Sequence, residues 1–214
     1  MRVFVLILGF HEDHAIRVLT EFGAIKEDNI LVFTAKPAVP AVRRAFEGLR
    51  SYALRAGLKE PKIVEVPQNF YEGISVILEA LEEFNIETEH VFELSGGMRY
   101  LLIYLLLALI LSRRKGWIVI YPEGGEEKEI VIPKQVLELT VNPPGKAELN
   151  VLKQAISAPG TSVEEISLQL GKSVKTIQNI VSMLVKEGLV IRKGRRGGIY
   201  PTKLGELVSE YMKS

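Results

Sequence analysis

Residues 90–121, HVFELSGGMRYLLIYLLLALILSRRKGWIVIY, decide the fold. Two short apolar runs, HVFEL and WIVIY, have strand character, and between them a helical pattern extends over residues 98–114. Both runs are largely apolar and lack the alternation of a half-exposed strand, which is typical of parallel strands covered by helices on both faces. The stretch therefore predicts a strand, helix, strand unit of an α/β domain.

The same alternation continues on the N-terminal side of this unit. Strand-like runs at RVFVLIL, ILVFTA and KIVEV are separated by helical patterns over residues 13–22, 39–56 and 70–84. The pattern predicts a doubly wound, Rossmann-like domain with a mostly parallel sheet. Residues 122–133 are expected to form a hairpin with Gly124 and Gly125 in its turn, and residues 135–141 one further strand. NPPG at residues 142–145 is a plausible joint, so the expected domains are 1–142 and 146–214.

Length and composition narrow the class of protein. The chain has 214 residues, 47% of them hydrophobic, which is enough for two packed domains. It has no cysteine, so disulfides and thiolate metal sites are excluded, and a reducing cytoplasmic location is expected. The longest apolar run, residues 101–111, is much shorter than the roughly 18 to 20 residues that cross a bilayer. No membrane association is therefore expected.

Charge is distributed unevenly between the two parts. Residues 146–214 hold 11 of the 27 Lys and Arg but only 6 of the 26 acidic residues, which leaves 16 basic and 20 acidic residues in the first part. The smaller part is therefore basic by five charges although the whole chain carries only +1. Such asymmetry is typical of a nucleic-acid-binding module joined to a domain with another role.

The basic part has the element order of a winged helix-turn-helix. A helix over residues 146–157 ends at Ala158-Pro159-Gly160, and Thr161 or Ser162, each with a glutamate three residues later, caps a second helix. Gly171 ends that helix, and a third helix follows over residues 174–187. Two apolar strand-like runs then flank a glycine- and arginine-rich tip, and a last helix covers residues 203–212. The order resembles winged helix-turn-helix domains of archaeal and bacterial transcriptional regulators. The alternative is a module used only for oligomerisation.

Polar residues of the third helix and basic residues of the hairpin are the candidates for contact with double-stranded DNA. Apolar residues at helical spacing leave one face of the helix polar, where amides can pair with adenine edges and hydroxyls or lysines can reach phosphates. The hairpin would follow the phosphate backbone as the wing. The expected DNA-binding residues are Lys172, Ser173, Lys175, Thr176, Gln178, Asn179, Ser182, Arg192, Lys193, Arg195 and Arg196.

Ligands of open α/β sheets bind at the carboxyl ends of the strands. Three loops there attract attention: residues 8–13 after the first strand, residues 34–37 after the second and residues 95–99 after the fourth. In Ser95-Gly96-Gly97-Met98-Arg99 the glycines allow close backbone approach, and the following helix presents its amino end and a cation to a phosphate. A tight strand-to-helix turn is the alternative explanation of Gly96-Gly97. The expected ligand-binding residues are Gly9, Phe10, His11, Thr34, Lys36, Ser95, Gly96, Gly97, Met98 and Arg99.

Common cofactor sites are disfavoured. Neither a P-loop nor a GxGxxG sequence occurs, which argues against ordinary nucleotide hydrolysis and dinucleotide oxidoreduction. His11 and His14 could suggest a metal, but no third ligand is evident, and a loop residue and a helix-start residue explain them better. No catalytic residue, metal or cofactor is expected.

The whole pattern resembles the CRISPR-associated Rossmann-fold (CARF) transcriptional regulators of archaea, those associated with type I-A systems. The resemblance rests on Gly9-Phe10, on Ser95-Gly96-Gly97-Met98-Arg99 and on the order of the two domains. It implies a homodimer in which two CARF domains share a cyclic oligoadenylate, expected to be cyclic tetra-adenylate, across a two-fold axis. Ligand binding would then alter the spacing of two recognition helices on promoter DNA.

The expected function is a ligand-responsive transcriptional regulator of CRISPR-associated genes, without catalysis. One alternative is a CARF-type ring nuclease, in which His11, Lys36 or Arg99 would position a ribose hydroxyl or stabilise the phosphate. Another is a DNA-binding regulator that takes no cyclic oligoadenylate. The operator, the direction of regulation and the ring size are not encoded in any recognisable motif.

Overall fold

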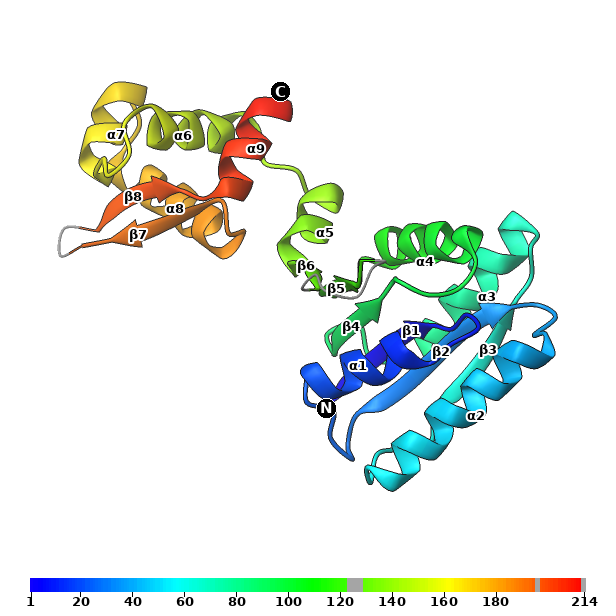
Figure 1. Cartoon of the computed structure of the whole chain (residues 1–214). Coiled ribbons are helices and arrows are strands. Elements are labelled where there is room, and N and C mark those ends of the chain that lie inside the picture. The colour runs from blue at the N-terminus through cyan, green and yellow to red at the C-terminus, as the bar shows by residue number, and fades with distance from the viewer. Residues whose placement is uncertain (123–128, 195–196, 213–214) are drawn as a thin grey trace. The chain divides into compact units, whose positions relative to one another are not determined.

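The computed structural model describes residues 1–122, 129–194 and 197–212. The chain divides into two compact units, Met1–Leu137 and Glu138–Ser214 (Figure 1). The division falls within a helix, α5 (Lys134–Val141), whereas the sequence placed the joint at residues 142–145. No helix among the described residues is long and apolar enough to span a bilayer.

The first unit alternates strands and helices as the sequence predicts. Its strands are β1 (Arg2–Ile7), β2 (Asn29–Ala35), β3 (Lys62–Val66), β4 (Glu89–Glu93), β5 (Gly116–Ile120) and β6 (Ile130–Ile132). The helices between them are α1 (Asp13–Glu21), α2 (Pro40–Arg55), α3 (Phe70–Glu82) and α4 (Arg99–Ser112). Helix α3 begins where the Asn69 side chain accepts hydrogen bonds from the first-turn amides of Tyr71 and Glu72.

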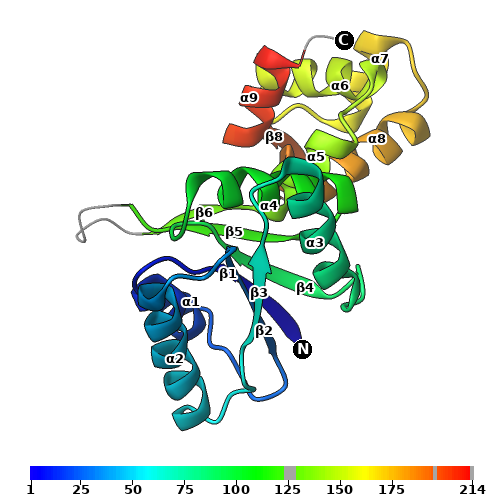
Figure 2. The same cartoon turned by 90° about the vertical axis from the view of Figure 1, so that its right-hand side faces the viewer.

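The six strands form one sheet in the order β3-β2-β1-β4-β5-β6, and all neighbours are parallel except β5 and β6. This confirms the mostly parallel, Rossmann-like prediction. One face carries Phe4, Leu6 and Val91 and packs against α1 and α2, and the other face packs against α3 and α4 (Figure 2). Both faces are therefore buried, as the apolar strands required. The strand order reverses between β1 and β4, and the carboxyl ends of these strands form the usual ligand crevice.

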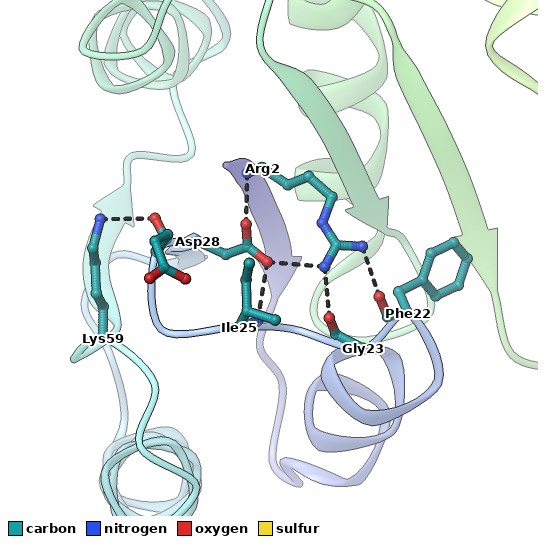
Figure 3. A network of polar contacts seen from close by, with 7 residues as sticks. Arg2, Phe22, Gly23, Ile25, Asp28 and Lys59 are labelled. Carbon is teal, nitrogen blue, oxygen red and sulfur yellow. Dashed lines mark hydrogen bonds and ion pairs between the residues drawn. The ribbon is translucent and has the colours of Figure 1, made fainter.

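A polar network lies at the opposite end of β1, where the strand begins. Arg2 donates hydrogen bonds to the carbonyls of Phe22 and Gly23 and pairs with Asp28 at 2.9 Å (Figure 3). Asp28 is 1% exposed and also accepts from the backbone amides of Arg2 and Ile25. Burial opposes ionisation, but the amides of Ile25 and Arg2 and the guanidinium together hold the pKa of Asp28 below its ordinary value. The network anchors the turn between α1 and β2.

The second unit contains helices around a small hairpin. Its elements after α5 are α6 (Lys146–Ser157), α7 (Val163–Leu170), α8 (Val174–Lys186), β7 (Val190–Lys193), β8 (Gly198–Pro201) and α9 (Lys203–Tyr211). Strands β7 and β8 are antiparallel, with Ile191 opposite Tyr200. Its core includes Leu152, Ile166 and Leu184, contributed by three different helices. The helices and strands therefore lie where the sequence predicted them, to within about a residue.

The prediction of a strand over residues 135–141 is wrong, because this segment is helix α5. The amide of Val136 bonds to the carbonyl of Pro133, and that of Asn142 to the carbonyl of Glu138. A helix satisfies its backbone groups internally, whereas a further strand would need a partner beyond β6. The hairpin prediction agrees with the antiparallel pairing of β5 and β6, while Gly124 and Gly125 lie outside the described residues.

Candidate functional site

A cavity of about 530 Å³ opens at the carboxyl ends of β1, β2 and β4. It brings together parts of all three loops that the sequence singled out. Its lining consists of Leu8, Gly9, Phe10, His11, Asp13, His14, Thr34, Ala35, Pro37, Val39, Val42, Ser95, Gly96, Gly97 and Met98. A cavity of this size suits a small organic ligand.

The floor of the cavity is made where two backbone segments cross. A Cβ built on Gly96 would lie 2.6 Å from the carbonyl oxygen of Ile7, and one on Gly9 would lie 2.9 Å from the amide nitrogen of Gly97. Gly97 has a φ of +78°, in the left-handed region that favours glycine. The close approach explains why glycine occupies these positions, since a Cβ at any of them would clash with neighbouring protein atoms.

Two predicted cations, Lys36 and Arg99, do not line the cavity. Lys36 is exposed beside the lining residue Pro37, and Arg99 is exposed as the first residue of α4, directly after the lining residue Met98. Neither side chain forms an ion pair within the described ranges. Both cations are therefore exposed and lie next to lining residues in the sequence.

Apolar and hydroxyl side chains complete the predicted set. Phe10 and Met98 are 64% and 50% exposed at the rim of the cavity. Thr34 is 1% exposed, and its hydroxyl donates to the carbonyl of Leu8 at 3.3 Å, so it stabilises the junction of β1 and β2. Large exposed apolar side chains beside a polar backbone floor can stack on the faces of nucleobases.

Two histidines, His11 and His14, lie at the cavity. His11 and His14 are both lining residues, and the ring of His14 stacks on Tyr121 with centroids 5.3 Å apart. Among the described residues, no group of three side chains could hold a metal ion. The stacking contact gives His14 a packing role at the start of α1.

Several lining residues were not predicted from the sequence. Ala35, Val39 and Val42 are apolar residues of a strand end and a helix start, and their composition does not distinguish them from core residues. Glu93 was also missed. It is a fully buried carboxylate at the end of β4, next to the glycine loop. An acidic residue inside an apolar strand was the available signal for it.

A second candidate site is the polar face of α8. Ile177, Ile180, Val181 and Leu184 are buried. The predicted residues Lys175, Thr176, Gln178, Asn179 and Ser182 are all exposed, which places them on one accessible helix surface. The structure thus separates the two faces as the helical spacing predicts.

The segment before α8 is held by local hydrogen bonds. The Ser162 side chain caps α7 in a capping box with Glu165, and Gly171 ends α7 with a φ of +62°. The Ser173 hydroxyl accepts from the amide of Thr176, so Ser173 is the N-cap of α8. Ser182 donates to the carbonyl of Gln178 within the helix. Ser173 and Ser182 therefore already have structural partners.

The described basic residues before and after α8 are exposed. Lys172 lies in the turn before the helix, and Arg192 and Lys193 are exposed on β7. The ammonium of Lys193 lies 5.8 Å from the ring centroid of Tyr200 on β8. Arg195 and Arg196, predicted at the hairpin tip, lie outside the described residues.

Comparisons with known proteins add a family and several similar chains. The chain is 28% identical over 215 residues to a Saccharolobus solfataricus protein named "CRISPR locus-related putative DNA-binding protein Csa3", covering 100% of this chain and 90% of that protein. Two solved structures show low similarity: VC1899 from Vibrio cholerae (14% identity, TM-score 0.44) and Can2 from Sulfobacillus thermosulfidooxidans in complex with cyclic tetra-adenylate (12%, 0.40). They cover 98% and 99% of this chain, which spans 63% of the length of each.

A family model described as "Csa3 CRISPR-associated Rossmann-like domain" matches residues 2–133. The match begins at the first residue of β1 and extends just past the end of β6. It therefore includes the whole sheet and every loop that lines the cavity. Because the match covers more than half of the 214 residues, the chain belongs to the family that carries the Csa3 CRISPR-associated Rossmann-like domain.

Proposed function

We propose that the protein is a homodimeric transcriptional regulator of CRISPR-associated genes that binds a cyclic oligoadenylate in its first unit and double-stranded DNA with its second. The observation that carries the proposal is the cavity at the carboxyl ends of β1, β2 and β4, built within a CRISPR-associated family domain. The same chain continues into a basic unit with an exposed polar helix. A sensing site and a DNA-binding surface on one chain are what a ligand-responsive regulator requires.

The chemistry of the cavity favours a ligand that joins phosphates to nucleobases. The crossing glycine backbone and the amino end of α4 attract phosphate, and Lys36 and Arg99 supply nearby positive charge. Phe10 and Met98 offer apolar surfaces to adenine at the rim. A cyclic tetra-adenylate repeats a phosphate and an adenine base around its ring. Two symmetry-related cavities would each hold half of it.

An apolar surface on α4 supports the homodimer. The helix is apolar around its whole circumference, and Ile103 and Leu106 are 57% and 39% exposed on its outer side. Ile103, Leu106 and the half-buried Ile110 recur at helical spacing. A helix that is apolar all round is normally covered on all sides. A second copy of the same domain would cover this surface and place its own α4 and glycine loop nearby.

For the second unit we propose winged helix-turn-helix recognition. Helices α7 and α8 are joined by the Gly171 turn, and the β7–β8 hairpin follows α8 directly. In this mode α8 enters the major groove with Lys175, Gln178 and Asn179 toward base edges. Arg192 and Lys193, with Arg195 and Arg196 at the tip, would contact phosphates as the wing.

Isothermal titration calorimetry with cyclic tri-, tetra- and hexa-adenylate tests the ligand. We expect heat from the tetramer ring at one ring per two chains, and recovery of the ring intact after long incubation. Parallel gel-shift assays on the protein's own promoter region, with and without the ring, test the coupling. Absence of heat with every ring would refute the ligand, and equal affinity for promoter and unrelated DNA would refute the regulator.

A further inference from the structure

Glu93 is a buried carboxyl group directly beneath the glycine loop. It is the last residue of β4 and is 0% exposed. In the sheet register it lies between Leu6 of β1 and Val119 of β5, both of which are buried apolar residues. A carboxyl group in such surroundings loses its hydration, and leucine or valine would pack there at less cost. Its presence needs a reason other than packing.

The carboxyl group is bonded to the loop on one side only. Its Oε1 accepts a hydrogen bond from the backbone amide of Ser95 at 2.7 Å. Its Oε2 has no hydrogen-bond partner among the described residues. The Ser95 hydroxyl accepts from the amide of Tyr121 at 2.7 Å, which ties the same loop to the end of β5. Ser95 is itself a lining residue of the cavity. Glu93 is therefore linked to the cavity through a single residue.

The charged and titratable groups near Glu93 come from α1 and from the segment after β5. Tyr121 interacts electrostatically with Glu93, and its hydroxyl donates to Glu21 at 2.7 Å. The guanidinium of Arg17 lies 4.5 Å from the ring centroid of Tyr121 and is already paired with Glu21. The negative charge of Glu129 also attracts this guanidinium. His14 stacks on the same ring. No cation is bonded to Glu93 itself within the described part of the chain.

These surroundings favour the neutral carboxyl group. Burial raises the pKa of Glu93 to about 7, and hydrogen bonding from Ser95 offsets the effect only in part. The group therefore changes its charge within the physiological pH range. A phosphate held by the backbone of Ser95, Gly96 and Gly97 would lie close to this carboxyl, since only Leu94 separates Glu93 from Ser95 in the chain. In these apolar surroundings the negative phosphate and an ionised Glu93 would repel each other strongly.

We propose that Glu93 positions the Ser95–Gly97 loop and takes up a proton when an anionic ligand binds in the cavity. The loop-positioning part stands on the contact with the Ser95 amide, and the proton-uptake part rests on the proposed function. A protonated Glu93 still has a carbonyl oxygen that can accept the hydrogen bond from the Ser95 amide. Because it carries no charge, it does not repel the bound anion. Binding of the anion therefore draws up to one proton from the buffer to each Glu93, with the largest uptake above about pH 7, and the affinity falls as the pH rises.

Amide hydrogen exchange of the ligand-free protein tests the positioning. We compare Glu93→Gln, which keeps a carbonyl acceptor, with Glu93→Leu, which removes it. The loss of one buried hydrogen bond should make exchange at Ser95, Gly96 and Gly97 about tenfold faster in Glu93→Leu, while Glu93→Gln stays within about twofold of the wild type. Equal exchange at these three amides in Glu93→Leu and wild type would overturn the positioning role.

Calorimetry with cyclic tetra-adenylate tests the proton uptake. Titrations in buffers of different ionisation enthalpy measure the number of protons bound, and affinities are compared between about pH 6 and about pH 9. We expect the wild-type affinity to fall about tenfold for each Glu93 over this range, and so about a hundredfold for a ring shared by two chains, because a one-unit rise in the pKa of one group corresponds to a factor of ten. Glu93→Gln should bind with the low-pH affinity throughout and lose up to one proton of uptake per chain.

Glu21→Gln is the matched control, since Glu21 is also an acidic neighbour of Tyr121 but, unlike Glu93, accepts no hydrogen bond from the glycine loop among the described residues. It should keep the pH dependence of the wild type. His11 and His14 remain in every variant, so the difference between wild type and Glu93→Gln isolates Glu93. An identical pH profile and proton number in Glu93→Gln would overturn the proposal. Absence of binding at every pH would refute the proposed ligand and the proton uptake together, while hydrogen exchange would still decide the positioning.

Discussion

His90 and Glu93 lie at opposite ends of β4, and their burial makes the free energy of unfolding depend on pH in opposite directions. Burial and the positive charge of Arg114 lower the pKa of His90 to about 4. The folded protein therefore keeps His90 neutral while the unfolded chain binds a proton, so stability is lost as the pH falls below about 6.5. For Glu93 the raised pKa favours the protonated form, so stability is lost as the pH rises from about 4.5 to about 7.

The variant His90→Gln tests the first of these effects. Glutamine is neutral at all pH values and can accept a hydrogen bond from the Arg114 guanidinium, which lies 3.2 Å from the His90 ring. The full shift of the histidine pKa corresponds to about 3 kcal/mol between pH 6.5 and pH 4. Urea unfolding of both proteins across this range should show the loss in wild type and its reduction in the variant. Parallel curves would contradict the assignment.

The variant Glu93→Gln tests the second effect in the ligand-free protein. Removing the ionisable group removes the cost of charging a buried carboxyl at neutral pH. At about pH 8 the variant should be more stable than the wild type by up to about 3 kcal/mol, and near pH 4 the two should be equal. Urea unfolding at the two pH values measures this difference. A variant that is less stable at about pH 8 would show that the carboxylate stabilises the fold.

The variant Gly96→Ala tests whether the close approach of the glycine loop to the end of β1 shapes the cavity. A methyl group there would meet the carbonyl oxygen of Ile7, which cannot move without disturbing β1. Gly96→Ala should therefore displace the loop and reduce cyclic tetra-adenylate affinity at least about tenfold, with DNA binding by the second unit retained. Gly57→Ala is the control, because Gly57 also lies in the first unit, has a φ of +71° and has no atom near the added methyl group. Equal losses of ligand affinity in both variants would contradict the role of the crossing.

At this scale the sequence predicted the glycines and missed the carboxylate. Gly9, Gly96 and Gly97 were recognisable because glycine after a strand signals close backbone approach. Glu93 was missed although an acidic residue in an apolar strand is a signal, because its effect depends on which residues of β1 and β5 lie beside it in the sheet, and that register is not visible in the order of residues. The cavity-lining residue Val42 of α2 was missed because its apolar side chain cannot be told from a core residue in the sequence.

Among the secondary-structure elements, β7 and α8 have separable roles in the proposed DNA binding. Arg192→Ala with Lys193→Ala should weaken binding to all sequences and lower the slope of log affinity against log salt by about 1.8, since each phosphate contact contributes about 0.9. Fluorescence anisotropy over a range of salt concentrations measures this slope. Lys203→Ala is the control, because Lys203 on α9 is paired with Glu206 and lies outside the proposed surface. An unchanged slope in the double variant would refute the wing.

Gln178 on α8 should affect specificity instead. An amide side chain pairs with adenine in the major groove, so Gln178→Ala should reduce the preference for the promoter over unrelated DNA by about 1 to 3 kcal/mol and leave the salt slope unchanged. Competition gel shifts with both DNAs provide the measurement. Equal loss of affinity for both DNAs would mean that Gln178 contacts the backbone.

The prediction of the elements failed only where local pattern and tertiary context disagree. The β-branched residues of QVLELTV suggested a strand, yet α5 forms a helix in which Leu137 packs in the first core and Leu139 in the second. The sequence pattern does not reveal that this short segment contributes one leucine to each of two hydrophobic cores. By contrast, α7 and α8 carry their own capping residues and apolar spacing, so their limits were predictable.

For the whole molecule, the two units fold around separate cores, so a ligand in one can influence DNA binding by the other only if the assembly has more than one arrangement. The proposed homodimer would supply such arrangements, since the distance between two copies of α8 would have to match half-sites about 34 Å apart. The exposed apolar residues of α4 belong to the first unit. Dimerisation there would couple the ligand cavity to the spacing of the DNA-binding units.

Ile103→Asp tests this coupling, because a charge in the middle of the α4 surface should be costly to bury at an interface but cheap on an exposed helix. Ile103 is 57% exposed in the single chain, so the variant should keep its fold, and sedimentation equilibrium should show a monomer for the variant and the proposed dimer for the wild type. Its affinity for a full promoter should fall to that for one half-site, and cyclic tetra-adenylate should no longer change it. Leu54→Asp on α2, at a similar 52% exposure, is the control and should remain dimeric. A dimeric Ile103→Asp with normal ligand response would move the interface away from α4.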